Sequence, residues 1–177
     1  MVFDFYYRLS APRRREYERS DSLDAPELDQ GLMQPLGDRL QAALVSGDQT
    51  SVRMGAQAVA DAFNTALRLP PIRVSVLRTR PQRGGSEYHG YYEGGEGGDK
   101  ARITLWMFTA RRRQVVAYRT FLRTLVHELC HHLDFEGFRM DESFHTEGFY
   151  KRESALFRRI LGDPPRAVAA RVTGKQA

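Results

Sequence analysis

The spacing of apolar residues changes twice along this chain, and that change limits the folds the chain can adopt. Apolar side chains recur at helical spacing between residues 32 and 67. Residues 72–77 alternate between apolar and polar side chains, and residues 103–108 form a second predicted strand. Two long helices are then predicted over about 114–135 and 146–161. An order of helices, then strands, then helices predicts an α+β fold, not the alternation of a parallel sheet.

The chain has 177 residues, which suits a single domain. We expect that domain to span residues 31–162, because the periodic segments lie there. Residues 1–30 precede it as an arm, and residues 163–177 are expected to form a tail. The arm is expected to be loosely held, because charged residues crowd it and Pro12 and Pro26 interrupt it.

Composition excludes several classes of protein. With 41% hydrophobic and 28% charged residues, the chain resembles an ordinary globular domain. No window approaches the ~18 apolar residues of a membrane helix, so no membrane partner is expected. The N-terminus carries an acid and aromatics where a signal peptide has basic residues and an apolar run, which favours a cytoplasmic protein. The single cysteine, Cys130, excludes an internal disulfide and a zinc ribbon of four cysteines.

The positive charge leaves two interpretations open. The formal net charge is +5, and arginines cluster at residues 13–15 and 111–113. Such runs often form a solvated surface, but they also attract nucleic acid or another polyanion. A net charge of this size does not decide between the two, so nucleic acid stays a candidate partner.

Four of the five histidines lie between positions 127 and 145, and two belong to the motif His127-Glu128-Leu129-Cys130-His131. Residues four apart lie one turn apart on the same helix face, so both imidazoles can reach one zinc ion. Glu128 then lies beside the metal, where it can take a proton from a zinc-bound water and pass it to the leaving amine. The pattern predicts zinc ligands at His127 and His131 and a general base at Glu128.

The predicted helix suits this role because its faces differ. At about 100° per residue, Thr120 and Thr124 share the face of the two histidines. The opposite face is apolar and consists of Leu122, Val126, Leu129 and Leu133. One face can therefore pack on a core while the other leaves room for a substrate.

A catalytic zinc site usually has three protein ligands and one open position. His145 is the favoured third ligand, because it follows a turn and begins the next helix, where its side chain can fold back over the first. Glu153, on that following helix, is the main rival. Asp134 lies about 10 Å along the helix from His127, so it is better suited to supporting a ligand than to being one.

These segments occur in an order that resembles the SprT-like metallopeptidase family. The resemblance covers about residues 60–160 and rests on Phe63-Asn64, Pro70–Val74, Gly90-Tyr91-Tyr92, Arg102–Leu105, Leu125–Leu133 and His145–Phe149. It implies a zincin-like fold and zinc endopeptidase activity. It also implies His145 as the third ligand, because that ligand opens a His-Gly-x-x-aromatic segment in the family. Here Thr146 replaces the glycine, and the cysteine-rich ribbon of some members is lacking. The family is associated with cleaving proteins crosslinked to DNA, but this chain has no recognisable DNA-binding module.

The sequence thus predicts one zincin-like α+β domain with N-terminal helices, a small mixed sheet of three or four strands, the motif helix and a following helix. Its predicted function is hydrolysis of a protein or peptide substrate by a zinc-bound water that Glu128 activates. Two alternatives stay open. One is a non-catalytic module whose zinc supports binding of nucleic acid or protein. The other is a degenerate peptidase whose cleft a partner or the N-terminal arm blocks.

The substrate cleft is expected beside the sheet. Either strand 103–108 or a tyrosine-rich hairpin around residues 88–92 would form its edge, where an extended peptide could pair with the backbone. Tyr91, Tyr92 and Arg152 are candidates for stabilising the oxyanion that develops on the scissile carbonyl.

Overall fold

The computed structural model describes residues 3–79, 82–83, 86–87, 90–95, 99–109 and 114–163. Its helices are η1 (Asp4–Arg8), α1 (Ala11–Ser22), α2 (Gln30–Ser46), α3 (Gln49–Leu67), α4 (Tyr118–His132), the π-helical turn η2 (Leu133–Gly137) and α5 (Glu147–Leu161). Its strands are β1 (Arg73–Thr79), β2 (Gln82–Arg83), β3 (Ser86–Glu87), β4 (Gly90–Glu93) and β5 (Arg102–Phe108). The predicted α+β class is confirmed. The arginine run 111–113 and residues 164–177 of the predicted tail lie outside the described residues.

The main sheet is small and mixed, with β5 at its centre. β1 pairs with β5 in parallel, with Arg73 opposite Arg102. β4 pairs antiparallel with the other side of β5, with Gly90 opposite Leu105, and β2 and β3 form a separate ribbon. Because β5 is paired on both sides, it cannot offer an edge to a substrate. Of the two predicted cleft edges, strand 103–108 is therefore wrong. β4, which contains residues 90–92 of the other predicted edge, lies at one edge of the sheet, and β1 lies at the opposite edge; residues 88–89 of the predicted hairpin lie outside the described residues.

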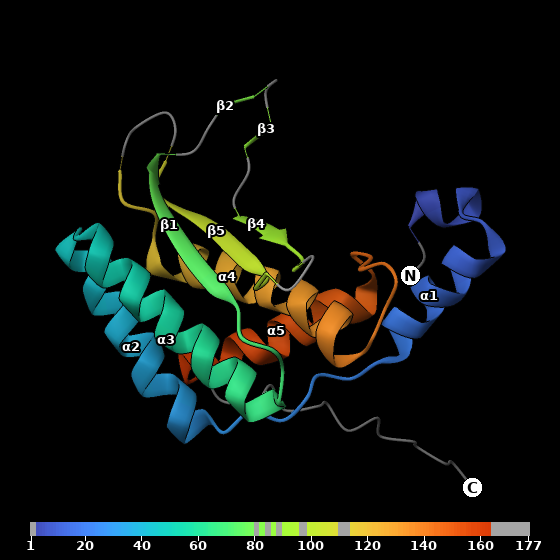
Figure 1. The fold of residues 1–177 in the computed structure, drawn as a ribbon, viewed down its shortest axis with the longest axis horizontal. Coiled ribbons are helices and arrows are strands. Elements are labelled where there is room, and N and C mark those ends of the chain that lie inside the picture. Colours follow the sequence, from blue (N-terminus) through green and yellow to red (C-terminus); the bar gives the residue numbers. More distant parts are fainter. Residues whose placement is uncertain are drawn as a thin grey trace, which may run out of the picture.

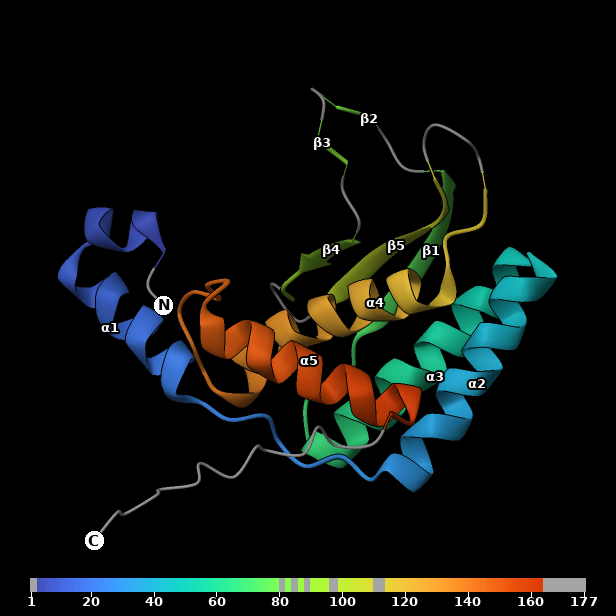
Figure 2. The same ribbon diagram turned by 180° about the vertical axis from the view of Figure 1, so that it is seen from behind.

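The helices pack around this sheet (Figures 1 and 2). α4 packs against β4 and β5, α5 packs against α4, and α3 lies beside β1 with α2 outside it. In both views, η1 and α1 lie at the opposite end of the molecule from α2 and α3. The predicted apolar face of α4 enters the core, where Leu122, Val126 and Leu129 are fully buried. Among the described residues, no helix combines the length and apolar character needed to cross a membrane.

Turn residues separate α2 from α3. Gly47 ends α2 in the left-handed conformation, with φ of 68°, which glycine adopts without steric cost. α3 begins at Gln49, directly after that turn. Asp48 is the cap, because its carboxylate accepts a hydrogen bond from the Ser51 amide at 2.7 Å.

α4 begins at Tyr118, later than the predicted start near residue 114. Val115 forms an antiparallel bridge with Phe108, and the Val116 amide donates to the Met107 carbonyl at 2.8 Å. These β-branched residues continue strand-like pairing with the end of β5. The helix can begin only after that pairing ends.

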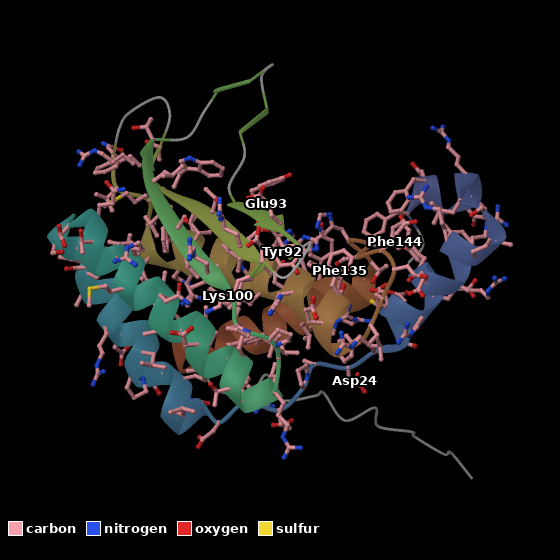
Figure 3. The ribbon with its side chains drawn as sticks, viewed as in Figure 1. Asp24, Tyr92, Glu93, Lys100, Phe135 and Phe144 are labelled. Atoms are coloured by element: carbon pink, nitrogen blue, oxygen red, sulfur yellow. The ribbon has the colours of Figure 1, made fainter. Side chains whose placement is uncertain are left out.

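The N-terminal segment is held against the domain, which corrects the expectation of a loosely held arm. Residues 4–8 form the 3-10 helix η1. Pro12 does not interrupt α1, because it lies in the first turn, where the missing N–H removes no helical hydrogen bond. Tyr17 is only 1% exposed and packs against Phe5 and Phe144, which Figure 3 places beside η1.

Candidate metal centre

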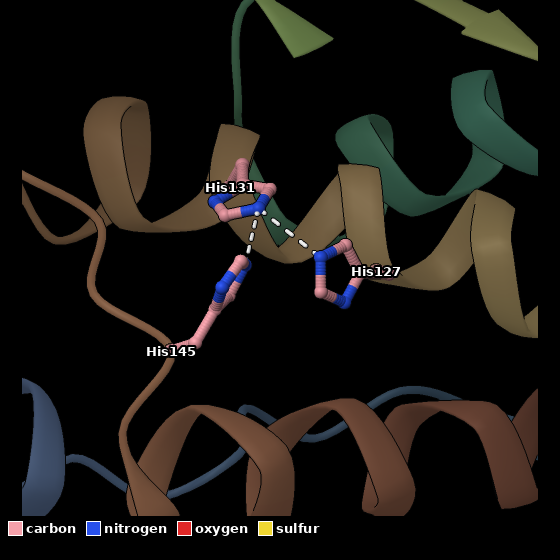
Figure 4. Close-up of side chains that lie close together, drawn as sticks. All are labelled: His127, His131 and His145. Carbon is pink, nitrogen blue, oxygen red and sulfur yellow. Dashed lines mark hydrogen bonds between the residues drawn. The ribbon is translucent and has the colours of Figure 1, made fainter. Parts of the chain in front are cut away.

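Three histidines from two segments point their rings at one another (Figure 4). His127 and His131 lie one turn apart on α4, and His145 approaches from the loop before α5. The Nε2 atom of His131 lies 3.3 Å from that of His127 and 3.1 Å from that of His145. One ligand nitrogen from each ring lies within 4.8 Å of the others. In a tetrahedral site with Zn–N bonds of about 2.0–2.1 Å, nitrogens are about 3.3 Å apart, so both separations from His131 match such a site and the three histidines could hold one metal ion.

Groups behind the cluster hold the far nitrogens of two rings. The Nδ1 atom of His127 is 3.0 Å from the Glu153 carboxylate, and that of His131 is 2.8 Å from Ser143 Oγ. Ser143 donates its only hydroxyl proton to Asp134 at 2.7 Å, so it must accept a hydrogen bond from the Nδ1–H of His131. Protons on Nδ1 leave Nε2 of both rings free for a metal, and such support is typical of ligating histidines. The supporting role predicted for Asp134 fits this position, whereas the sequence reasoning missed Ser143.

Glu153 lies behind His127 and outside the cluster of ligand nitrogens. One of its carboxylate oxygens is 3.0 Å from His127, and the other accepts from Arg123 at 2.7 Å. Burial alone would raise the pKa of Glu153, but the hydrogen bonds from His127 and Arg123 outweigh it and lower that pKa. Both oxygens of this ionised carboxylate are therefore engaged. Of the two candidates for the third metal ligand, His145 lies beside His127 and His131, whereas Glu153 supports His127 from behind.

The surroundings favour neutral imidazoles. Burial, together with the proximity of His127 and His145, lowers the pKa of His131 to about 3. Burial and the proximity of His127 also lower the pKa of His145. A metal binds the neutral ring, so these two histidines need not lose a proton at neutral pH before they bind one.

The side chain of Glu128 extends from α4 toward β4, and the residue is only 5% exposed. Its side chain packs against Gly90 so closely that a Cβ atom there would collide with the carboxylate. Burial raises the pKa of Glu128 to about 7, although the neighbouring His127 acts in the opposite direction. A carboxyl group with a pKa near 7 can both accept and release a proton at neutral pH.

Gly90 is expected to be required for this placement of Glu128. A Cβ atom at position 90 would also lie 2.6 Å from Thr124 Cγ2, so Gly90→Ala must displace the carboxylate, β4 or both. We expect kcat of the proposed hydrolysis to fall at least about tenfold, because misplacement by about 1 Å can cost 10²-fold, while zinc content stays at the wild-type level. Gly94→Ala, where a Cβ atom would meet nothing within 4 Å, is the matched control. Full activity in Gly90→Ala would show that the position of Glu128 is not critical.

The three oxyanion candidates do not point a free donor group at the cluster, although the ring of Tyr92 lies 6.3 Å from that of His131. Arg152 is completely buried and forms an ion pair with Asp134. The Tyr92 hydroxyl lies 3.2 Å from Nδ1 of His132, which is also buried. Tyr91 is 51% exposed and points to the opposite face of β4, because neighbouring side chains of a strand alternate. Their positions favour a structural role for Arg152 and Tyr92.

Two aromatic residues of α5 border the cluster instead. Phe149 is fully buried, and its ring centroid lies 5.0–5.1 Å from those of all three histidines. Tyr150 is 43% exposed and stacks on His145 with centroids 5.9 Å apart. The sequence reasoning missed Tyr150. Its signal was its place in the first turn of the helix that follows His145.

Comparisons with protein-family models, with curated proteins and with solved structures find no match to this chain. The geometry of the cluster and the motif that supplies it are therefore the features of this chain that indicate a function.

Proposed function

We propose that this chain is a zinc-dependent metalloendopeptidase with a zincin-like, SprT-like catalytic domain. The observation that carries the proposal is the cluster of His127, His131 and His145, in which both nitrogen separations from His131 match those of a tetrahedral zinc site. When bound there, zinc supplies a Lewis acid that lowers the pKa of a coordinated water to about 7 and polarises a carbonyl. Among the described residues the cluster offers three ligands, and structural zinc sites usually have four. That count favours a catalytic ion over a structural one.

Glu128 would act as the general base and then as the general acid. Its carboxylate takes a proton from the attacking water and delivers it to the nitrogen of the leaving amine. The pKa of about 7 suits both transfers. His127 and His131 keep fixed orientations during these steps, because Glu153 and Ser143 hold their Nδ1 atoms.

The substrate would bind as an extended peptide along β4. One side of β4 pairs with β5, and no described strand pairs with its other side. A peptide paired with that side would pass Gly90, which touches the Glu128 carboxylate. The exposed ring of Tyr150, stacked on His145, is placed to contact the same peptide.

Loss of His145 is expected to remove zinc from the purified protein. Two imidazoles on one helix turn bind far more weakly than three, so His145→Ala should fall from about one zinc per chain to well below it. Glu153→Gln tests the rival ligand. Its single amide oxygen can still accept the hydrogen bond of His127, although the bond from Arg123 is lost, so this variant should keep its zinc. Plasma mass spectrometry measures both. Zinc retained by His145→Ala and lost from Glu153→Gln would instead identify Glu153 as the third ligand. Absence of zinc from the wild-type protein would refute the proposed peptidase function.

Nucleic-acid binding receives less support from the described residues. Arg13 forms an ion pair with Glu142 at 2.5 Å, and Arg14 donates to the Tyr7 carbonyl at 2.7 Å. Two of the three arginines in this run thus have partners within the chain. A non-catalytic module that binds nucleic acid remains the alternative, and a zinc-loaded protein without peptidase activity would favour it.

A further inference from the structure

A buried arginine connects the end of α1, through hydrogen bonds, with the turn that follows α4. Arg152, on α5, is 0% exposed. Its Nη1 donates to the carbonyls of Ser20 and Leu23, at 2.5 and 3.1 Å. Its Nη2 donates to Ser20 Oγ at 3.1 Å and to Asp134 at 3.0 Å. One guanidinium therefore bridges the C-terminal turn of α1 and the turn that follows α4.

Asp134 extends this bridge to a candidate ligand. It is 0% exposed, and while one oxygen pairs with Arg152 the other accepts from Ser143 at 2.7 Å. Ser143 in turn holds Nδ1 of His131 at 2.8 Å. The ring orientation of His131 thus depends on a carboxylate whose own position is fixed by Arg152.

A second branch runs from the same turn of α1 toward His145. Ser20 Oγ lies 3.2 Å from Thr146 Oγ1, and Thr146 caps α5 by accepting from the Phe149 amide at 3.0 Å. Asp21 accepts from the Gly148 amide at 2.6 Å, and a Cβ atom on Gly148 would lie 2.6 Å from Cα of Asp21. The end of α1 therefore packs directly on the helix turn that follows His145.

We propose that Ser20, Asp21 and Leu23 position two histidines for metal binding. They act on His131 through Arg152 and Asp134, and on His145 through Thr146 and Gly148. The proposal rests on the metal site of the proposed function. These residues act through others and are not ligands. Groups that hydrogen-bond to a ligand fix its tautomer and orientation, and their loss typically weakens metal affinity 10–100-fold. The N-terminal segment is then part of the metal centre and not an arm beside it.

Three serines test the proposal in the full-length protein. Ser143→Ala cuts the link to His131 at a half-buried residue, and Ser20→Ala removes the hydroxyl that both branches share. Ser22→Ala is the matched control, because this exposed serine bonds only to the Arg19 carbonyl among the contacts of the described chain. The readouts are the zinc dissociation constant, by competition with a chelator, and the visible absorption bands of the cobalt-loaded protein.

We expect Ser143→Ala to weaken zinc binding by roughly 10–100-fold and to shift the cobalt bands. Ser20→Ala should weaken it severalfold, and Ser22→Ala should match the wild type. The double variant of Ser20 and Ser143 shows which branch carries the effect of Ser20→Ala on zinc affinity. If its affinity equals that of Ser143→Ala, the effect runs through Asp134. If the two losses of affinity multiply, the effect runs through Thr146. Both results support the proposal.

Wild-type zinc affinity and unchanged cobalt bands in Ser20→Ala and Ser143→Ala would overturn the proposal, even if both proteins melted at a lower temperature. In that case the zinc site of the proposed function would stand. A wild type that takes up neither metal would refute both. If Ser20→Ala does not fold, Asp21→Ala, at a partly exposed residue, tests the α1 contact through Gly148 by the same readouts.

Discussion

Replacement of Glu128 by glutamine is expected to lower kcat for peptide hydrolysis by about 10²–10⁴-fold, the range that general acid–base catalysis contributes. Glutamine has nearly the same size and can still fill the space beside Gly90, but it cannot accept a proton. Bulk water cannot take over the role easily, because the Glu128 side chain is only 5% exposed. Zinc content should not change, since the carboxylate is not among the ligand atoms. Initial rates on an unfolded protein substrate, with zinc determined in the same samples, measure both quantities.

Glu136→Gln provides the matched control for this experiment. Glu136 lies on the turn after α4 and forms an ion pair with Arg139 at 3.3 Å, away from the cluster. It should keep wild-type activity. Full activity of Glu128→Gln with zinc bound would exclude Glu128 as the base. Activity lost together with zinc would mean that Glu128 supports the metal and not the proton transfer.

The ligand cluster could be predicted because its geometry is local. His127 and His131 are four residues apart on one helix, so their common face follows from the helix period. His145 follows within fourteen residues, after a turn and at the start of the next helix, which leaves the chain few ways to place it far from the pair. Sequence reasoning therefore reached the three histidines but could not choose firmly between His145 and Glu153.

The supporting groups could not be predicted, because they depend on contacts between distant segments. Arg152 and Ser20 are separated by 132 residues, and Ser20 and Thr146 by 126. Nothing in the local spacing of these residues indicates that α1 reaches α5. Taken alone, charge and prolines in the N-terminal segment suggest a loosely held arm, whereas the buried Tyr17 and Ser20 hold it in place.

Strand order was also beyond the reach of periodicity. The pattern of apolar residues predicted the strands that became β1 and β5 but not which strands pair with each other. Over so few residues, the pattern does not distinguish a strand paired on both sides from one at an edge. β5 lies at the centre because both β1 and β4 pair with it. The Cβ-free backbone of Gly90, at the edge, then allows Glu128 to lie beneath β4.

Replacement of Arg152 by methionine is expected to lower the free energy of unfolding by about 3–5 kcal/mol, the usual cost of removing one partner from a buried ion pair. Asp134 would keep its charge in a fully buried position and would lose its only cationic partner in the described chain. The carbonyls of Ser20 and Leu23 would lose a donor at the same time. Urea unfolding of metal-free protein measures this change without the stabilisation that bound zinc would add.

Arg119→Met is the matched control. The Arg119 side chain is 64% exposed, so its ion pair with Asp163 should contribute at most about 1 kcal/mol to the free energy of unfolding. The double variant Arg152→Met with Asp134→Leu should recover part of the loss, since apolar residues often replace a buried ion pair at little cost. It should nevertheless keep the weakened zinc affinity, because nothing then orients Ser143. Recovery of stability without recovery of metal binding would separate the two roles of Arg152. If Arg152→Met lowers the free energy of unfolding by less than about 1 kcal/mol, water reaches the Arg152–Asp134 ion pair, and this pair does not hold α1 in place.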